Sequence, residues 1–106
     1  MIARVWRGVT RESDADEYGR YVIDTGFAEY GSTPGNQGAW LLRRDSDGLS
    51  EFVTFSLWEN REAVVAFAGE EIERAHYYPE DERFLVEKED TVKHFEVVSE
   101  IPPIGS

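Results

Sequence analysis

The sequence contains no cysteine, and this single absence excludes disulfide bonds, thiolate metal sites and cysteine nucleophiles. It also lacks any apolar run near the roughly 18–20 residues that a membrane-spanning helix needs. The opening residues, MIARVW, do not have the pattern of a signal peptide. We therefore expect a cytoplasmic protein that has no contact with a membrane.

Positive charge is scarce as well. The chain has 11 Lys and Arg residues against 22 Asp and Glu residues, which gives a formal net charge of -11. Nucleic acids and anionic membrane surfaces both repel so acidic a chain, and neither is an expected partner. The carboxylates concentrated in 70–90 are interpreted as a solvated face.

Apolar residues, by contrast, are plentiful. Hydrophobic residues make up 41% of the 106 positions and aromatic residues 13%. This is too much apolar mass for a disordered acidic tail, so we expect a packed core. The length is typical of one domain, which we expect to cover 1–106 with 98–106 as a tail.

Patterns typical of strands and helices alternate along the chain. Strand patterns, rich in β-formers and bounded by turn residues, cover 2–8, 39–44, 49–58 and 91–98. Helical spacing of apolar residues begins at Ala15, ending by Gly26 or Gly31, and recurs over 60–78. The order β-α-β-β-α-β predicts an α+β fold of the ferredoxin-like type, with an antiparallel sheet and both helices on one face.

Turn and cap residues set the expected boundaries. Ser13 has the sequence context of an N-cap for the first helix, and Asn60 has that of an N-cap for the second. The Ser-Asp-Gly sequence at 46–48 predicts a hairpin between the second and third strands. Gly69 is expected to break the second helix into two segments.

The strand expected over 49–58 is apolar on both faces. Val53, Phe55 and Leu57 alternate with a second set that includes Phe52 and Trp58. A sheet with one wet face normally shows a clean apolar and polar alternation. The face without helices must therefore be covered, and a second copy of the sheet is the simplest cover. The sequence thus predicts a homodimer.

Five stretches of the sequence carry a resemblance to a known family: WRG, YGSTPGNQG, LRRD, EFVTFSLWEN and FAGEEIERAHYYPEDERF. They resemble small proteins of the antibiotic biosynthesis monooxygenase family, over about residues 2–98. The resemblance implies a dimeric α+β barrel. It also implies a range of activities, because the superfamily includes cofactor-free oxygenases of polyketide quinones, haem-degrading oxygenases and isomerases.

From this resemblance we expect a cofactor-independent monooxygenase that acts on an aromatic, polyketide-like small molecule. The expected catalytic residues are His76, Trp58, Tyr77 and Tyr78. The imidazole of His76 is the candidate base that accepts the proton of the substrate. The other three side chains, and Arg4 as well, are candidate hydrogen-bond donors to the oxyanion of the deprotonated substrate.

The expected substrate-binding residues are Trp6, Arg4, Phe52 and Phe67. They combine apolar rings with one polar group, as small-molecule pockets do, and the same rings equally suit an ordinary core. We expect the site between the helices and the sheet, with Trp6, Trp58, Phe67 and His76 as its walls. Alternative hypotheses are a non-catalytic small-molecule-binding protein and a dimeric interaction protein of the same fold.

No metal, flavin or haem is expected. In haem-degrading relatives a His, an Asn and a Trp form the site, and this chain offers His76, Trp6 and Phe67 at those places, which retains one of the three. Glu73 has the spacing to share a helix face with His76, but such metal sites need a second pair. His94 and Glu96 alternate along a strand and leave a metal site underfilled.

Overall fold

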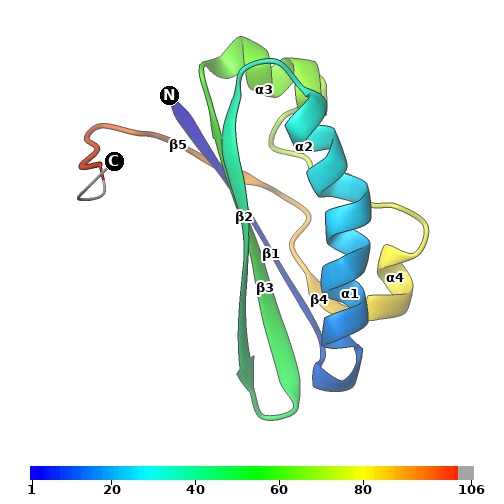
Figure 1. Cartoon of the computed structure of the whole chain (residues 1–106). Coiled ribbons are helices and arrows are strands. Elements are labelled where there is room, and N and C mark those ends of the chain that lie inside the picture. The colour runs from blue at the N-terminus through cyan, green and yellow to red at the C-terminus, as the bar shows by residue number, and fades with distance from the viewer. Residues whose placement is uncertain (103–106) are drawn as a thin grey trace.

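A computed structural model of the chain describes residues 1–102, and it shows a twisted antiparallel sheet with all helices on one face (Figure 1). The strands are β1 (Ile2–Arg11), β2 (Asn36–Ser46), β3 (Leu49–Trp58), β4 (Leu85–Lys88) and β5 (Lys93–Glu96). Their order is β2-β3-β1, with β4 and β5 both pairing with the outer edge of β1. The predicted α+β ferredoxin-like fold is confirmed.

The edge of the sheet that the last strand was expected to occupy differs from the prediction. A single strand was expected over 91–98, whereas two short strands, β4 and β5, share that edge of the sheet. β4 and the short helix α4 (Asp81–Phe84) lie in the acidic stretch that the sequence presents as a solvated connection. Residues 97–102 have no regular secondary structure, and residues 103–106 of the expected tail lie outside the described residues.

The hairpin between β2 and β3 is confirmed. Its turn consists of Asp47 and Gly48, whose φ angles of 54° and 78° are both positive. Two consecutive positive φ angles are typical of the type I′ turn, whose twist matches that of the strands it joins. The register then runs without a break from Ser46 opposite Leu49 to Ala39 opposite Ser56.

The first helical segment ends next to Gly31, the later of the two expected positions, but it is less regular than expected. It consists of a short 3-10 turn (Glu12–Asp14), α1 (Ala15–Val22), a π-helical stretch (Ile23–Phe27) and α2 (Ala28–Ser32). The prediction that Ser13 caps this helix is wrong, because Ser13 lies inside the 3-10 turn and α1 begins without a side-chain cap. Gly26 does not end the helix either, because the chain passes it in the π-helical stretch, whose wider turn is still hydrogen-bonded.

The second helix is shorter than expected. α3 covers Arg61–Ala68, and the Oδ1 atom of Asn60 accepts a hydrogen bond of 2.9 Å from the backbone N–H of Ala63, which confirms the predicted cap. Gly69, with φ of 84°, ends the helix. The helix expected up to residue 78 is therefore wrong, and Glu73 and His76 do not share a helix face.

Long-range backbone pairing replaces the expected second half of this helix. The N–H of Ala75 donates to the carbonyl of Asp90, and the N–H of Val92 donates to the carbonyl of Glu73. These bonds tie the segment after Gly69 to the chain entering β5, so it runs along the sheet edge in an irregular path. None of the helices in residues 1–102 is long and apolar enough to span a membrane.

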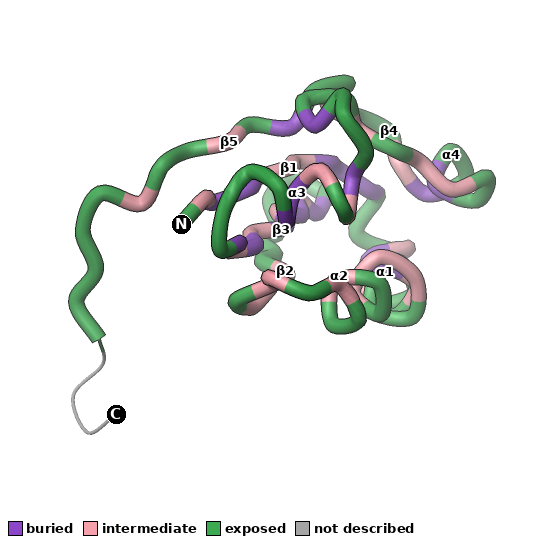
Figure 2. Tube along the Cα trace, turned by 90° about the horizontal axis from the view of Figure 1, so that it is seen from above, coloured by how far each residue is buried: buried purple, intermediate pink, exposed green. Residues whose placement is uncertain are grey.

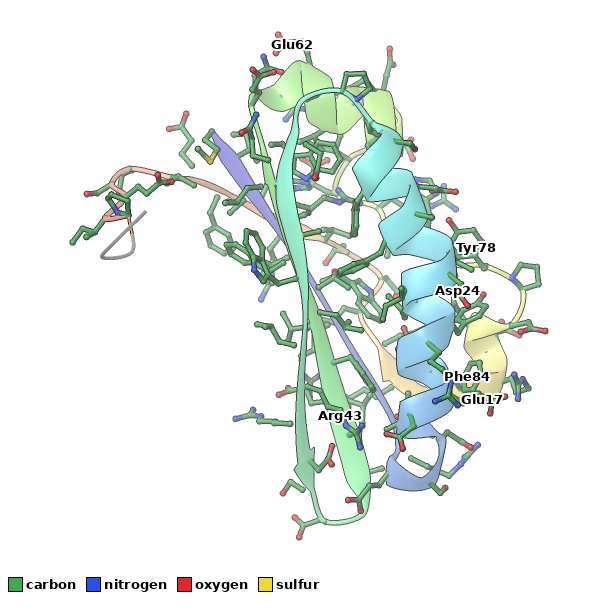
Figure 3. All side chains as sticks on the ribbon, in the orientation of Figure 1. Glu17, Asp24, Arg43, Glu62, Tyr78 and Phe84 are labelled. Atoms are coloured by element: carbon green, nitrogen blue, oxygen red, sulfur yellow. The ribbon has the colours of Figure 1, made fainter. Side chains whose placement is uncertain are left out.

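The helix-facing side of the sheet carries two groups of buried side chains. One is built around Tyr18, Phe52 and Phe84, and the other around Trp58 and Val64. Figure 2 shows the buried residues along β1 and α3, and the exposed residues along the chain after β5. Phe84 lies beside α1 (Figure 3), where its ring is 5.5 Å from that of Tyr18.

The opposite side of the sheet is apolar and uncovered by this chain. Trp40, Leu42 and Phe95 are 47%, 51% and 55% exposed, respectively. Val53 and Phe55 lie between them on the same side, as the pairing of Leu42 with Val53 and of Trp40 with Phe55 requires. The predicted double-sided apolar character of β3 is confirmed.

Candidate functional site

A cavity of about 480 Å³ lies between the helices and the sheet. The sheet supplies Arg4, Trp6 and Thr54, which lie on its helix-facing side because residues 4 and 6 alternate along β1 and Thr54 pairs with Trp6. The helices and the irregular segment supply the other walls, among them Tyr18, Tyr30, Phe67, His76, Tyr78 and Asp81. The cavity therefore lies where the sequence predicts a site.

Gly69 explains how Phe67 and His76 reach one cavity. An unbroken helix would direct side chains nine residues apart to opposite sides, because nine residues make 2.5 turns at about 3.6 residues per turn. The positive φ of Gly69 instead ends α3 and turns the chain, so both residues line the cavity. The predicted break at this glycine is confirmed.

Trp6 and Tyr77 form a fixed pair at the cavity wall. The indole N–H of Trp6 donates a 2.9 Å hydrogen bond to the hydroxyl oxygen of Tyr77, and that hydroxyl donates to the backbone carbonyl of Glu89. The two rings meet edge to face with centroids 6.1 Å apart. Burial raises the pKa of Tyr77. Because its only hydrogen is already donated, Tyr77 orients Trp6 and has no hydrogen left for a ligand.

His76 lies at the mouth of the cavity, with much of its side chain exposed. Its Nε2 atom is 3.0 Å from the backbone carbonyl oxygen of Ala68. A carbonyl oxygen only accepts, so Nε2 carries the hydrogen and Nδ1 is the accepting nitrogen of the neutral ring. This tautomer suits a group that takes a proton from a neighbouring molecule.

Two predicted site residues do not line the cavity. Phe52 is packed beneath Tyr18, with ring centroids 5.0 Å apart, and belongs to the core. Trp58 is fully buried behind Phe67, with ring centroids 5.1 Å apart, and its indole N–H donates to the hydroxyl of Ser56 at 2.9 Å. Both face the helices as predicted, but α1 and α3 pack directly over them and leave no open space there.

Arg4 is the most buried cation of the site, with 6% of its surface exposed. Its Nη1 atom donates to the carbonyl of Ile72 at 2.7 Å and to Nε2 of His94 at 2.9 Å. The guanidinium carbon lies 5.8 Å from the centroid of the Phe67 ring. Burial lowers the pKa of Arg4, and the Tyr30 hydroxyl partly offsets this effect.

Asp81 is a functional candidate that the sequence does not reveal. It is 6% exposed, lines the cavity, and accepts a hydrogen bond of 2.5 Å from the backbone N–H of Tyr78. Burial raises the pKa of its carboxyl group. In the sequence it is one of many carboxylates in an acidic stretch, and nothing local distinguishes it from its solvated neighbours.

Tyr30 is a second residue of the cavity that the sequence interpretation missed. Its ring packs against that of Phe67 with centroids 4.7 Å apart, and it also faces Trp58. Tyr78, the other predicted tyrosine, lies beside the first helical segment (Figure 3), where its ring meets that of Tyr21 edge to face at 6.5 Å. Burial is the main cause that raises the pKa of Tyr78, and the nearby Glu29 adds to it.

The described side chains of the cavity do not gather into a metal site. Within residues 1–102, no three His, Cys, Asp or Glu side chains gather closely enough to hold a metal ion. An axial haem ligand has to be a histidine nitrogen that faces the cavity. Nε2 of His76 is bonded to a carbonyl and Nε2 of His94 is bonded to Arg4, so Nδ1 of His76 is the histidine nitrogen of the cavity that remains available, with the Trp6 ring on the adjoining wall.

This architecture also occurs in solved structures of other proteins, although the sequence itself matches no known family. No protein-family model matches the sequence, and no curated protein matches it. Solved structures match nearly the whole chain. A Bacillus cereus protein assigned to the antibiotic biosynthesis monooxygenases is 15% identical, with a TM-score of 0.69 and coverage of 99% of this chain and 98% of that one. The fold is that of the antibiotic biosynthesis monooxygenases.

Two further structures with this monooxygenase fold differ in chemistry. The haem degrader MhuD of Mycobacterium tuberculosis, solved with two haems in its active site, is 19% identical with a TM-score of 0.63, and the match covers 96% of this chain and 100% of that one. SnoaB, a cofactor-independent oxygenase of Streptomyces nogalater, is 19% identical with a TM-score of 0.62, covering 96% and 97%. The monooxygenase fold alone therefore does not select the reaction.

Proposed function

We propose that this chain is a cofactor-independent monooxygenase that acts on an aromatic, polyketide-like small molecule bound in the cavity. The cavity carries the proposal, because it combines aromatic walls with a small number of ionisable groups at defined places. The fold shared with a cofactor-independent oxygenase supports it. Nδ1 of His76, which remains an acceptor because Nε2 is bonded to the Ala68 carbonyl, supplies the base that such a reaction needs.

In the proposed reaction the substrate supplies all the electrons. An acidic CH₂ group between aromatic rings loses a proton to Nδ1 of His76, and the resulting carbanion forms a C–O bond with dioxygen. His76 returns the proton to the peroxide oxygen. Cleavage of the O–O bond with loss of water, which takes the second hydrogen of the same carbon, leaves a carbonyl group. One oxygen atom enters the product and the other leaves as water, so no external reductant is needed.

The cavity residues have distinct parts in this proposal. Trp6 and Phe67 pack against the faces of the substrate, and Tyr77 holds the Trp6 ring in place. In this proposal Tyr78 exchanges its hydrogen bond with Glu29 for one to the oxyanion of the deprotonated substrate, while the hydroxyl of Tyr77 and the indole N–H of Trp58 stay bonded to other groups of the chain. The mostly apolar wall excludes water from the carbanion.

The test is oxygen consumption by the purified protein with anthrone-like and quinol substrates, without added metal or flavin. We expect uptake of one dioxygen per quinone formed, and a loss of about 100-fold or more in His76→Ala, since general bases contribute about 10²–10⁴-fold. Asp81→Asn is the comparison variant. Loss confined to Asp81→Asn would move the proton-accepting role to that carboxyl group, and no uptake with any substrate would contradict the oxygenase proposal.

A non-catalytic binding protein is the second candidate function. The observation that favours it is the engagement of the Tyr77 hydroxyl, which leaves the cavity with fewer free donors than an oxyanion site normally has. Substrate analogues that bind by calorimetry without consuming oxygen would support this candidate over the first.

We also infer that the protein forms a homodimer through the uncovered face of the sheet. Trp40, Leu42 and Phe95 give this face an exposed apolar centre. Charged residues lie along one side of this apolar centre, where Glu51 forms ion pairs with Arg7 and with Arg44, the latter at 2.6 Å. An apolar centre with a charged rim is the composition of a protein interface, and a second copy of the same face supplies a matching surface under two-fold symmetry.

A further inference from the structure

Arg4 is a buried cation without an anion. Both of its hydrogen bonds leave from Nη1, and both go to uncharged groups, the carbonyl of Ile72 and the imidazole of His94. The guanidinium also contacts the hydroxyl of Tyr30, which carries no charge either. Six other arginines form ion pairs with carboxylates, and all six are more exposed than Arg4: Arg7, Arg11, Arg43, Arg44, Arg74 and Arg83. Arg20 and Arg61 also form no ion pair among residues 1–102, but both are exposed to water, so Arg4 is the buried arginine without an anionic partner.

The surroundings of Arg4 supply no compensating charge. No carboxylate of the described residues forms an ion pair with it, and Glu73 acts only as a more distant charge. Buried charges in folded proteins are normally paired, because removing a charge from water without a partner is unfavourable. An unpaired guanidinium at a cavity wall is therefore a place where a partner from outside the chain is missing.

His94 adds an unused donor to the same network. Its Nε2 accepts from Arg4, so the hydrogen of the neutral ring lies on Nδ1, and that atom is buried without a partner in the described part of the chain. Burial and the adjacent positive charge of Arg4 lower the pKa of His94, which keeps the ring neutral. Within the described residues, this network therefore combines a buried positive charge without an anion and a buried N–H without an acceptor.

The remaining walls indicate the rest of the ligand. Phe67 and Tyr30 pack beside the guanidinium, which places aromatic surface next to the charge. Asp81 lines the same cavity near Tyr78, so its carboxyl group disfavours a second anion in that region. A ligand that suits both regions has one acidic group directed at Arg4 and a neutral aromatic body across Trp6.

We propose that the cavity binds an aromatic carboxylic acid whose carboxylate pairs with the guanidinium of Arg4. This inference rests on the proposed role of the cavity as a ligand site and names the chemical class of that ligand. A carboxylate offers two acceptor oxygens in the geometry that a guanidinium presents, so Arg4 gains the anionic partner that the described residues do not supply.

The test is calorimetric titration with matched pairs of probes: 2-naphthoate against 2-naphthamide, and anthracene-2-carboxylate against its amide. The wild-type protein is expected to bind each acid at least about 10-fold more tightly than the amide. Arg4→Gln is expected to remove this preference while leaving the affinity for the amides within about 2-fold. Arg7→Gln is the control and is expected to keep the preference. Arg7 lies three residues after Arg4 in β1, on the opposite side of the sheet.

Several results would overturn the inference. Equal affinity for acids and amides in the wild type would do so, as would a preference that survives in Arg4→Gln. If Arg4→Gln does not fold, by near-ultraviolet circular dichroism, Arg4→Lys replaces it and is expected to keep part of the preference through its charge. Failure of all four probes to bind would contradict both the inference and the role of the cavity as a ligand site.

Failure of the inference and failure of the oxygenase proposal give different results. If the protein prefers acids through Arg4 but consumes no oxygen with any substrate, the acid-binding inference holds and the oxygenase proposal fails. If it consumes oxygen with neutral anthrones at the same rate as with acidic ones, the oxygenase proposal holds and the acid-binding inference fails.

Discussion

Gly8 lies directly beneath the ring of Trp6. A Cβ atom added at this glycine would be 2.3 Å from Cη2 of that ring and 3.1 Å from the side chain of Leu85. The ring cannot move away freely, because the indole N–H is bonded to Tyr77. The absence of a side chain at residue 8 therefore sets the position of one cavity wall.

We expect Gly8→Ala to lower the free energy of unfolding by about 1–3 kcal/mol, as overpacking of a well-packed site does. Urea denaturation measures the change, and calorimetry with 2-naphthamide is expected to show weaker binding because the Trp6 ring is displaced. Gly19→Ala is the matched control. Its Cβ would meet only Phe52 at 3.9 Å, and in the interior of α1 alanine is expected to raise stability by about 0.5–1 kcal/mol.

The buried carboxyl of Asp81 gives the stability of the protein a pH dependence of defined sign. Burial raises its pKa in the folded state above that in the unfolded state, so the folded state holds the proton to higher pH. Stability from this group is therefore present below the unfolded pKa and falls as the pH rises through the folded pKa.

Asp81→Asn removes this titration and keeps an oxygen that can accept from the N–H of Tyr78. We expect the variant to gain stability relative to the wild type as the pH rises from about 4 towards neutrality. Urea denaturation across that range measures the difference in stability between the two proteins. Asp45 and Glu51, whose pKa values are lowered, contribute equally to both, so their effects cancel in the difference. A constant difference across the whole range would contradict the assignment.

Single residues of the site were only partly predictable. The alternation of β1 and β3 correctly assigned Trp6, Phe52 and Trp58 to the helix-facing side. Alternation says which side a residue faces, but the packing of helices above it decides whether open space remains. Phe52 and Trp58 lie under α1 and α3, and so became core. Asp81 carried no local signal, since its burial follows from tertiary packing.

Gly69 decides the path of the chain between α3 and the cavity. The apolar spacing continues through Ile72 and Ala75 after the glycine, so the sequence favours more helix than forms. Backbone bonds from Ala75 to Asp90 and from Val92 to Glu73 stabilise the irregular path instead. Such pairing joins residues far apart in the chain, which is why local spacing did not reveal it, whereas the break itself was visible in the glycine.

We expect Gly69→Ala to lower the free energy of unfolding by about 1–2 kcal/mol, because φ of 84° is unfavourable for a residue with a side chain. The effect is conformational and not steric, since the added Cβ would meet nothing within 4 Å. Gly26→Ala is the control, because it also meets nothing within 4 Å but has no positive φ. Urea denaturation compares the two, and equal effects would argue against backbone strain at Gly69.

For the molecule as a whole, the uncovered face of the sheet sets the expected assembly. Leu42 lies on this face and is 51% exposed in the single chain, so a charged side chain there does not need burial for the chain to fold. We expect the wild type to be a dimer at micromolar concentration by light scattering, and Leu42→Glu to be a folded monomer. Phe55→Glu, at a half-buried position, is expected to dissociate or unfold the protein.

Ile23→Glu is the control for this surface. Ile23 is similarly exposed, at 54%, but lies in the helical segment on the other side of the molecule, so its substitution is expected to leave the dimer intact. A well-behaved wild-type monomer of 12.2 kDa would contradict the predicted homodimer.

The three tryptophans of the chain lie in three different environments. Trp6 lines the cavity, Trp58 is fully buried in the core, and Trp40 is half exposed on the uncovered sheet face. Because indole emission shifts to longer wavelength as water gains access, variants that keep one tryptophan and replace the other two with phenylalanine report on separate events. Trp6 is expected to follow occupation of the cavity, Trp58 to follow unfolding, and Trp40 to follow dissociation of the proposed dimer on dilution. The protein thus carries its own set of optical probes, and no external dye has to be attached to it.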